Sequence, residues 1–446
     1  MPMFFFSQRR RALFDAGLGD RFAWDRNAAF TRQQRGMARC CRLKAAFRRC
    51  AQRHLAIDLC LAVALLVAQS GARADGVVLT NFTRLTNGAV QLKASGSVTQ
   101  VCSLQISGNL TNWRTLDFTN VAAGDAAFLD NAAALATNRY FRARTDTPFT
   151  NIIVTNYHGW ANSILMRNSQ VEVAIVPAVG RIMQFRFLDQ ADGPFWENPS
   201  MYGVQPSSTS WNTPGSFGGD KVWPSPQTWP WPPPRGFDST NYTAVVTNGM
   251  VVMTGPVDST FGTRVIRRIT LHPTEPILRV TSRFEKMSGA NSQIGVWVIT
   301  QTKEALRVFI PVPGNTVFSN GYVNIPGNPA PPSLMVSNKF ISLVRDPNAS
   351  SKIGTDAGAM LWVGTNSVLL IESPRLPGLA KTNYPDGGCS AEIYTNPGAT
   401  AYIELELLAP LVNMGVSSTA EATSVYSLFR RTQPTPLDEA QKIFAP

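Results

Sequence analysis

From residue 77 onward the chain consists of short runs in which apolar and polar residues alternate, and this pattern limits the fold more than any other feature. Examples are VEVAIVP (171–177), TRVIRRITL (263–271) and AYIELELLA (401–409). A period of two is typical of strands that bury one face, whereas amphipathic helices repeat every 3.6 residues. Asn-Gly, Asp-Gly and Pro-Gly pairs between the runs mark turns. The sequence therefore predicts an all-β protein of antiparallel strands.

The first 74 residues differ from the rest of the chain in charge. They contain 14 Lys and Arg but only 4 Asp and Glu, a net charge of +10, whereas the remaining residues carry only +2. The excess of positive charge therefore belongs to this leader. Nucleic-acid binding needs a basic surface on the folded protein, so we do not expect it.

The leader has the pattern of an export signal. A basic flank (48–53) precedes the apolar run Leu59–Ala68, which is too short for a membrane-spanning helix of about 20 residues. Residues 72–74 fit a small-x-small cleavage site. We expect an exported protein, periplasmic or extracellular, that starts at Asp75 and has no membrane association after cleavage; an uncleaved anchor is the alternative. A later start at Met37 would make residues 1–36 an over-call of the reading frame.

The mature chain contains few residues that bind metals or act as nucleophiles. Only Cys102 and Cys389 follow the leader. They do not make a disulfide scaffold or a zinc site, although a single bond between them stays open. His158 and His272 are not spaced as metal ligands, so we predict no metal and no cofactor, and no serine–histidine triad. His272, in TLHPTEP, is interpreted as part of a strand-ending turn.

A small β-sandwich module is predicted at residues 75–146. The segments LQISGNLTNWRTL and NRYFRAR resemble small β-sandwich modules of secreted bacterial proteins. That resemblance implies that Trp113 is the core tryptophan and that Tyr140 and Phe141 belong to the last strand. A module of this size is expected to act in spacing or adhesion.

A second, larger unit is predicted at residues 151–432. It is too long for a simple seven-stranded sandwich. Residues 433–446 form a tail, in which we expect a short helix at Leu437–Phe444.

The stretch Trp211–Asp238 is rich in rigid residues. It contains four tryptophans and seven prolines. Because proline fixes φ and removes ladder donors, we predict a long, stiff loop here and no helix or central strand. Indole faces beside a few charges suit a sugar, whose C–H patches stack on rings while its hydroxyls bond to polar groups. The alternative is a loop that only covers one end of the β-core.

Glu404 and Glu406 are the most informative carboxylates. They lie two residues apart in a predicted strand, so both side chains point to the same face. If both are buried, at least one should have a raised pKa, which prepares a carboxyl group for acid–base catalysis. The alternative is a strand edge that faces solvent.

Other polar residues lie beside aromatic residues at the ends of predicted strands. His158, in NYHGW, is a further candidate for catalysis, with a structural role as its alternative. The predicted substrate-binding residues are Glu197, Asp220, Lys221, Trp223, Gln227, Trp297, Gln301, Tyr384, Asp386 and Glu392.

Five ordered motifs within residues 155–432 resemble a known family. They are GGDKVWPSPQ with a following WPPP and Phe-Asp, VWVITQT, KIGTDAG, YPDGGCSAEIYTN and YIELELLAP. Together they resemble the domain-of-unknown-function 4380 family of the galactose-mutarotase-like superfamily. The resemblance implies a large antiparallel β-supersandwich that holds a carbohydrate on a concave sheet face, with loops at its rim.

The same resemblance suggests how a sugar could be transformed. Aldose 1-epimerases of the superfamily use a carboxylate base on a late strand, which Glu404 or Glu406 matches, and a histidine acid. The comparable stretch here, RFEKMSGANSQIGVWVITQ, contains no histidine, so Lys221 or His158 would have to supply the proton. The leading hypothesis is an exported carbohydrate-binding protein; the alternatives are an aldose 1-epimerase or other sugar-active enzyme, and a surface or adhesion protein.

Overall fold

The computed structural model describes most of the chain after the leader. The described residues are 77–85, 89–96, 100–120, 125–130, 138–147, 151–206, 216–238, 240–337, 339–376 and 378–444. The predicted export signal, its cleavage site and Trp211 lie outside them. The residues from Val77 onward belong to one compact unit, and the predicted boundaries between modules stay predictions.

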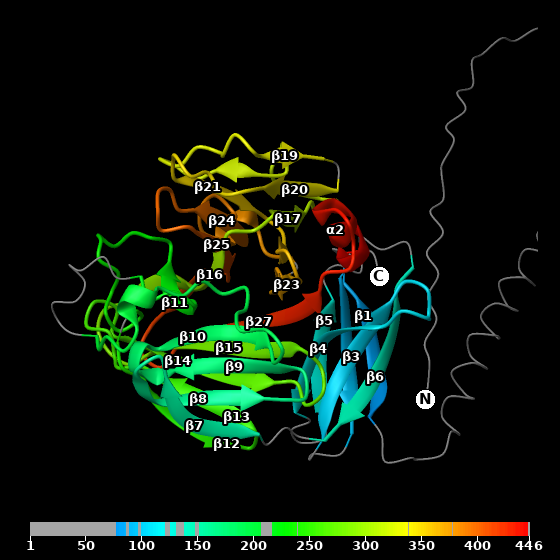
Figure 1. Cartoon of the computed structure of the whole chain (residues 1–446), viewed down its shortest axis with the longest axis horizontal. Helices are drawn as coiled ribbons and strands as arrows, with labels where there is room; N and C mark the ends of the chain where they lie inside the picture. The colour runs from blue at the N-terminus through cyan, green and yellow to red at the C-terminus, as the bar shows by residue number, and fades with distance from the viewer. Residues whose placement is uncertain are drawn as a thin grey trace, which may run out of the picture. The chain divides into compact units, whose positions relative to one another are not determined.

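Two large antiparallel sheets account for most of the strands (Figure 1). In sheet order, the 11-stranded sheet consists of β18 (Val323–Asn324), β21 (Ser351–Thr355), β24 (Ala391–Thr395), β25 (Tyr402–Leu408), β16 (Ser292–Lys303), β11 (Asp220–Ser225), β10 (Arg181–Phe187), β9 (Val171–Val176), β8 (Trp160–Arg167) and β7 (Ile152–Tyr157), with β26 (Val412–Met414) also paired to β16. The 10-stranded sheet consists of β12 (Thr243–Thr247), β13 (Met250–Thr254), β14 (Thr263–Leu271), β15 (Ile277–Lys286), β27 (Thr419–Arg430), β23 (Ser367–Glu372), β22 (Ala359–Val363), β17 (Arg307–Pro311), β20 (Phe340–Leu343) and β19 (Met335–Val336).

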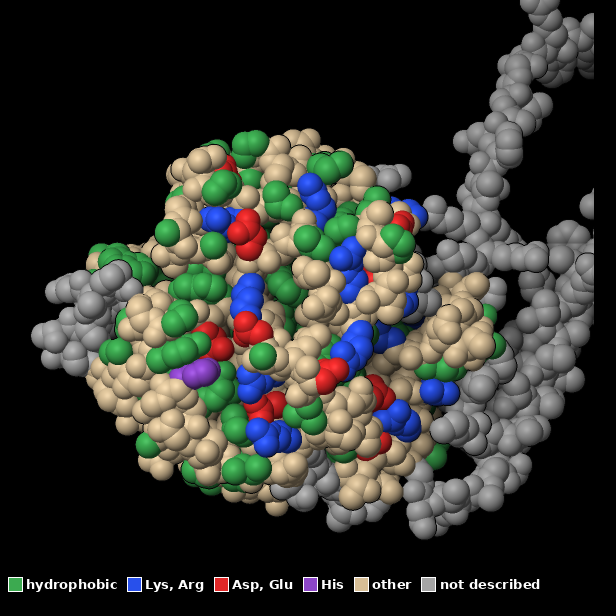
Figure 2. Space-filling view, in the orientation of Figure 1, with side chains coloured by type: hydrophobic (Ala, Val, Ile, Leu, Met, Phe, Trp, Pro, Cys, Tyr) green, Lys and Arg blue, Asp and Glu red, His purple; other side chains and the backbone are tan. Residues whose placement is uncertain are grey.

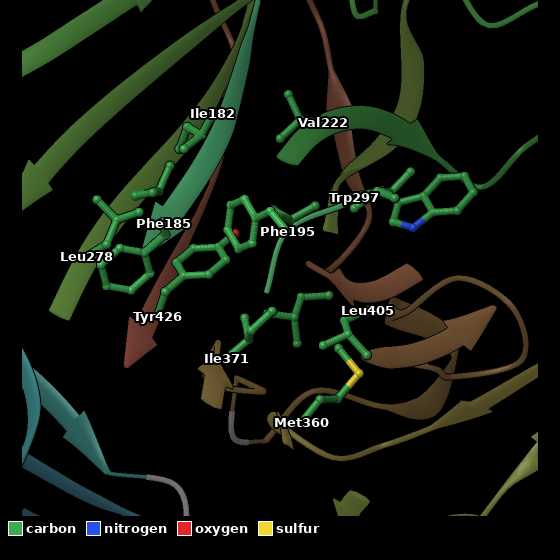
Figure 3. Close-up of a cluster of buried hydrophobic side chains, with 14 of the residues drawn as sticks. Ile182, Phe185, Phe195, Val222, Leu278, Trp297, Met360, Ile371, Leu405 and Tyr426 are labelled. Atoms are coloured by element: carbon green, nitrogen blue, oxygen red, sulfur yellow. The ribbon is translucent and has the colours of Figure 1, made fainter. Parts of the chain in front are cut away.

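The main hydrophobic core lies between these two sheets. Figure 3 shows Ile182 and Val222 of the 11-stranded sheet in one cluster with Leu278, Ile371 and Tyr426 of the 10-stranded sheet. Full burial of a side chain of this size contributes about 1.5–3 kcal/mol. The alternating runs thus face inward as expected, and the predicted all-β architecture with a large antiparallel sandwich is confirmed.

Six strands form two small sheets near the start of the described chain. Their members are β1 (Val78–Arg84), β2 (Val90–Ser95) and β5 (Asp125–Asp130) in one sheet, and β4 (Arg114–Asn120), β3 (Val101–Ser107) and β6 (Tyr140–Asp146) in the other. Leu92, Leu104 and Phe128 pack between them with Phe141, which lies in the last strand as predicted.

The prediction that Trp113 is the core tryptophan of the small module is wrong. Its side chain is only half-buried, the Arg142 guanidinium lies 4.2 Å from its ring centre, and its Nε1 donates to the Leu110 carbonyl oxygen at 3.0 Å. Aliphatic and phenylalanine side chains fill the core, so the indole was free to take a place where its N–H meets an acceptor.

The prediction that Trp211–Asp238 contains no central strand is also wrong. Residues Asp220–Ser225 form β11, whose register with β16 runs from Asp220 opposite Thr300 to Ser225 opposite Gly295. On its other side β11 pairs with β10 only at Asp220. Beyond that point one edge of the strand has no partner strand among the described residues, and a proline such as Pro224 is tolerated at such an edge.

The helices in the described part of the chain are few and short. The α-helix α2 (Pro436–Phe444) agrees with the helix predicted in the tail, and 3-10 helices span Pro177–Val179, Pro199–Met201 and Lys381–Asn383. None of the helices in the described residues has the length and apolar character needed to cross a membrane. Cys102 and Cys389 are both buried and free, so the open disulfide between them is not formed.

Candidate functional site

The candidate site lies on the outer face of the 11-stranded sheet, where β11, β16, β25, β24 and β21 are neighbours. Glu404 on β25 is directly opposite Gln301 on β16 and Tyr394 on β24. Two residues further along β25, Glu406 is opposite Glu392. Directly opposite side chains on one face are within reach of one another, so the strand register itself brings predicted site residues together.

Glu404 is held by two polar neighbours. The Gln301 side chain donates a hydrogen bond from Nε2 to Glu404 Oε1 at 2.9 Å, and Lys221 Nζ lies 3.8 Å from the same oxygen. Burial raises the pKa of Glu404, and the positive charge of Lys221 opposes that shift. The side chain is still 12% exposed, which makes this carboxylate reachable from solvent.

The orientation of Gln301 is fixed by further contacts. Its Oε1 accepts from Ser216 Oγ at 2.7 Å and from Arg181 Nη1 at 3.5 Å. Because both partners are donors, the oxygen faces them and the amide NH₂ faces Glu404. Gln301 therefore orients the carboxylate.

Lys221 lies between two carboxylates and an indole ring. Its Nζ is 3.8 Å from Asp238 Oδ2 as well as from Glu404, and it lies 3.9 Å from the Trp223 ring centre. Asp238 also forms a buried ion pair with Arg181 and accepts from Trp223 Nε1 at 2.8 Å. Burial lowers the pKa of Lys221, while Asp238 and Glu404 act against that shift.

A second charged group lies next to the first. Lys352 on β21 has its Nζ 2.8 Å from Glu392 Oε2 and 2.8 Å from Glu406 Oε2, and Trp297 Nε1 donates to Glu406 Oε2 at 2.7 Å. Burial raises the pKa of Glu392 to about 8, although Lys352 opposes the shift. Burial would lower the pKa of Lys352, but the two carboxylates outweigh it and raise that pKa.

Half-buried aromatic rings border Glu404. The Tyr402 ring lies 4.9 Å from the Trp196 ring and 6.4 Å from the Tyr394 ring, measured between centroids, and all three residues are partly exposed. Tyr402 lies on β25 with Glu404, and Tyr394 lies on the neighbouring strand β24, directly opposite Glu404. The rings thus present apolar surface beside a reachable carboxylate.

The tryptophans of the Pro-rich segment lie on the same face. Trp223 makes edge contacts with Trp229, Trp231 and Trp297 at centroid distances of 5.4, 6.2 and 5.5 Å. Trp223 and Trp229 are buried, whereas Trp231 is 65% exposed. Of the three tryptophans of this segment that the structure describes, two are therefore packed in a cluster and one is at the surface. Gln227 is exposed in the loop that follows β11.

Asp220 does not belong to this face. It is fully buried, forms an ion pair with Arg267 of β14, and its Oδ2 accepts from Tyr426 at 2.6 Å and from Thr300 at 2.7 Å. Successive residues of a strand point to opposite faces, so the neighbour of Lys221 points into the core between the sheets.

Glu197 and His158 are linked to each other through Tyr157. The Tyr157 hydroxyl donates to Glu197 Oε1 at 3.0 Å, and Gln184 Nε2 donates to Glu197 Oε2 at 3.1 Å. Burial raises the pKa of Glu197 to about 7. His158 is exposed and stacks on Tyr202 at a centroid distance of 4.0 Å. Among the described residues no hydrogen bond or ion pair joins either side chain to Glu404.

The outer face over β8–β10 carries charges that neutralise one another. Glu172 pairs with Arg167 and, at 2.7 Å, with Arg186. Figure 2 shows acidic and basic side chains next to one another on the face in view. The described residues contain no group of three or more His, Cys, Asp or Glu placed to hold a metal ion.

Tyr384 and Asp386 belong to a turn before β24, as the sequence predicts. The Tyr384 hydroxyl accepts from the Leu376 N–H at 2.8 Å, and Arg375 lies over its ring at 3.9 Å. Asp386 has a positive φ of 52° in this turn, and its carbonyl oxygen accepts from the Cys389 thiol at 3.1 Å. These contacts of both residues are with other residues of this turn and of the segment before it.

Sequence reasoning missed several residues of the cluster as candidates. They are Arg181, Ser216, Asp238, Lys352, Trp196 and Tyr402. Three of them lie inside the quoted motifs: Asp238 in the Phe-Asp pair, Lys352 in KIGTDAG and Tyr402 in YIELELLAP. Reading every polar residue of those motifs as a candidate would have found these three.

The fold and the site together define an all-β sandwich protein with a charged face, edged by aromatic rings, on one of its two large sheets. No protein-family model matches the chain, and no curated protein matches it either. The resemblance to the domain-of-unknown-function 4380 family therefore stays a prediction.

Several solved structures show a distant similarity. A galactose mutarotase-like protein from Lactobacillus casei has a TM-score of 0.44 and 9% identity, covering 60% of this chain and 100% of the other. A galactose mutarotase-related enzyme from Lactobacillus acidophilus has a TM-score of 0.38 and 9% identity, covering 60% and 97%. A TPR-domain-containing protein from Parabacteroides distasonis has a TM-score of 0.40 and 10% identity, covering 81% and 56%. TM-scores below 0.5 carry no argument about function.

Proposed function

We propose that the protein binds a carbohydrate at Glu404, on the outer face of the 11-stranded sheet. One observation carries the proposal: a carboxylate that is 12% exposed is oriented by Lys221 and Gln301 and bordered by partly exposed rings. Carboxylates accept hydrogen bonds from sugar hydroxyls, and aromatic rings stack against sugar C–H groups.

The arrangement also provides the rigidity that such a site needs. Gln301 is fixed by Ser216, and Lys221 is confined between Asp238 and Trp223. Groups that are already oriented lose little conformational freedom on binding, so more of the interaction energy appears as affinity. We further propose that the protein is exported and that its large sandwich is of the galactose-mutarotase type, as the sequence motifs imply.

Isothermal titration of the full chain against a panel of neutral mono- and oligosaccharides tests the proposal. We expect binding to at least one of them, and a loss of at least about tenfold in affinity when Tyr402→Ala removes a stacking surface worth about 1.4 kcal/mol. Tyr140→Ala, in the small sheets, is the matched control and should bind as the wild type does. No heat across the panel, or equal affinities for the two variants, would contradict the proposal.

A second candidate function is a sugar isomerase with Glu404 as the general base. The observation that favours it is the raised pKa of a reachable carboxyl group 3.8 Å from an ammonium group, because the pair could remove and supply a proton. Glu406 is the weaker choice, since it is 1% exposed and held by both Lys352 and Trp297. Polarimetry of α-glucose and α-galactose tests this: Glu404→Gln should abolish any enzyme-dependent rate, and an unchanged rate excludes Glu404 as the base.

A further inference from the structure

A cavity of about 760 Å³ has a lining that is different from the residues of the candidate site. Its walls come from the small sheets, from β15 and β27 of the 10-stranded sheet, from Gln170 and the end of β10 at Phe187, and from α2. Cavities of about 300–1,000 Å³ are typical of small-molecule binding sites. No residue of the Glu404 site lines this cavity, so a ligand bound here would be a second one.

The cavity is lined by more positive than negative side chains. Five basic residues face two acidic ones, Glu275 and Glu439. Three of the basic residues have a carboxylate partner: Arg114 with Glu372 at 2.7 Å, Arg144 with Glu275 at 2.7 Å and Arg430 with Asp189 at 2.8 Å. Arg142 and Lys442 form no ion pair with any residue that the structure describes.

Arg142 is oriented by its neighbours but not neutralised by them. Its Nε donates to Gln105 Oε1 at 2.8 Å, and its guanidinium carbon lies over Trp113, 4.2 Å from the ring centre. These contacts leave its two terminal nitrogens without a hydrogen-bond partner in the described part of the chain. Burial and the nearby charge of Arg144 lower the pKa of Arg142, and the charge of Glu275 opposes that shift without forming an ion pair with it among the described residues. A planar guanidinium in this state is suited to a bidentate oxyanion.

Glu439 of α2 has the opposite need, because one of its carboxylate oxygens lacks a hydrogen-bond donor in the described part of the chain. This side chain is fully buried, and its Oε2 accepts from the N–H groups of Thr432 and Gln433 at 2.8 and 2.6 Å. Its Oε1 has no donor among the described residues. A buried carboxylate oxygen without a donor is costly. Glu439 lines the cavity, and a ligand hydroxyl that reached this oxygen would supply the missing donor.

We propose that this cavity binds an acidic saccharide, with the carboxylate or sulfate group on Arg142 and a hydroxyl group on Glu439. An oxyanion and a hydroxyl donor on one molecule satisfy both unmet groups, which a neutral sugar or a simple anion does not. Lys442, whose Nζ donates to Thr432 Oγ1 at 2.6 Å, adds positive charge at the same wall. The proposal is separate from the carbohydrate site at Glu404 and does not depend on it.

Calorimetric titration of the full chain with three ligands tests the proposal: an oligomer of galacturonic acid, a sulfated galactose oligomer and a neutral galactose oligomer of equal length. We expect one of the two acidic oligomers to bind, which also separates carboxylate from sulfate recognition. Arg142→Gln should weaken that binding at least about tenfold, the loss of one charged hydrogen-bonding partner. Lys442→Gln, on an exposed part of α2, should weaken it by a smaller factor and serves if Arg142→Gln does not fold.

Two control variants separate this site from others. Arg268→Gln removes a partly exposed arginine that pairs with Glu421 outside the cavity and should bind like the wild type. Glu404→Gln should leave the binding of the acidic oligomer unchanged, so a failure of the Glu404 proposal is distinguishable from a failure of this one. Equal affinity of the Glu404→Gln protein for the neutral oligomer, for inorganic sulfate or for a glutamate peptide would overturn the proposal, as would unchanged binding in both Arg142→Gln and Lys442→Gln.

Discussion

Asp220 and Lys221 are neighbours on β11, yet their side chains enter two different buried charge clusters. Asp220 points between the two large sheets, where Arg267, Thr300 and Tyr426 satisfy its carboxylate. Lys221 points to the outer face, where it lies 3.8 Å from Glu404. Asp220 is fully buried, whereas Glu404 keeps 12% of its side-chain surface exposed.

The comparison separates stability from binding. The inner cluster joins strands of both sheets, and its carboxylate has a partner from each of them, so there is nothing left for a ligand to bind. The outer cluster has a carboxylate within reach of solvent and rings at its border. Because successive side chains of a strand point to opposite faces of the sheet, adjacent residues can have a structural role and a ligand-binding role.

The largest expected effect is on stability, from Asp220→Asn. Removing the charge leaves Arg267 buried without its partner, and breaking a buried ion pair in this way costs about 3–5 kcal/mol. Urea unfolding should show a clearly lower midpoint. The double variant Asp220→Leu, Arg267→Met should recover much of the loss, because it leaves no unpaired charge. An unchanged midpoint for Asp220→Asn would remove the distinction between the two clusters.

The next effect concerns pH and Glu392. Burial raises the pKa of Glu392 from 4.5 to about 8, so the folded protein binds more protons than the unfolded chain between these values. The stability contributed by the protonated group is complete below pH 4.5 and is lost as the pH rises through about 8, with a slope of at most about 1.4 kcal/mol per pH unit.

Glu392→Gln provides the measurement of that slope. The amide cannot ionise, so the difference in unfolding free energy between wild type and variant should change in favour of the variant from pH 5 to pH 8. Thermal or urea unfolding at several pH values supplies the data. A difference that is constant with pH would show that Glu392 is not protonated in the folded protein.

A smaller effect is expected on affinity from Gln301→Met. The variant removes the hydrogen bond that orients Glu404, so the carboxylate can turn toward Lys221 and the affinity for a bound sugar should fall about tenfold. The isosteric Gln301→Glu would place two carboxylates together and should be worse. Titration calorimetry checks both. Affinities equal to that of the wild type would show that the orientation of Glu404 is unimportant.

The smallest effect is expected from His158→Asn. His158 lies in an exposed turn with a positive φ of 48°, a conformation that asparagine tolerates well. Among the described residues it has no polar contact with the Glu404 cluster. Sugar affinity should change by less than about twofold, or about 0.4 kcal/mol. A large loss would bring His158 into the binding site.

Short sequence patterns predicted the features of the molecule that depend on residues close together in the chain. The alternation in YIELELLAP placed Glu404 and Glu406 on one face, and a short helix was expected in the tail. The alternative of a solvent-facing strand edge is wrong, because β25 lies between β24 and β16. The turn around Tyr384 and Asp386 was also predicted from its residues.

Long-range pairing was beyond those patterns. Lys352 reaches Glu406 only because β21 pairs with β24, and Asp238 reaches Lys221 only through the path of a loop. Because of the prolines around Trp223, a loop was predicted where β11 lies. Without a strand there, the sequence did not indicate that Asp220 and Lys221 point to opposite faces. Between the small sheets, aliphatic and phenylalanine side chains fill the core position that was predicted for Trp113.

Titration of Glu404→Gln with the sugar that binds best to the wild type tests the central claim most directly, provided that unfolding of the same sample is measured in parallel. The side chain keeps its shape but loses its charge. We predict that the unfolding midpoint stays close to that of the wild type and that sugar affinity falls at least about tenfold, the loss of a charged hydrogen bond. Wild-type affinity in a folded Glu404→Gln protein would contradict the assignment of the outer face as the binding site.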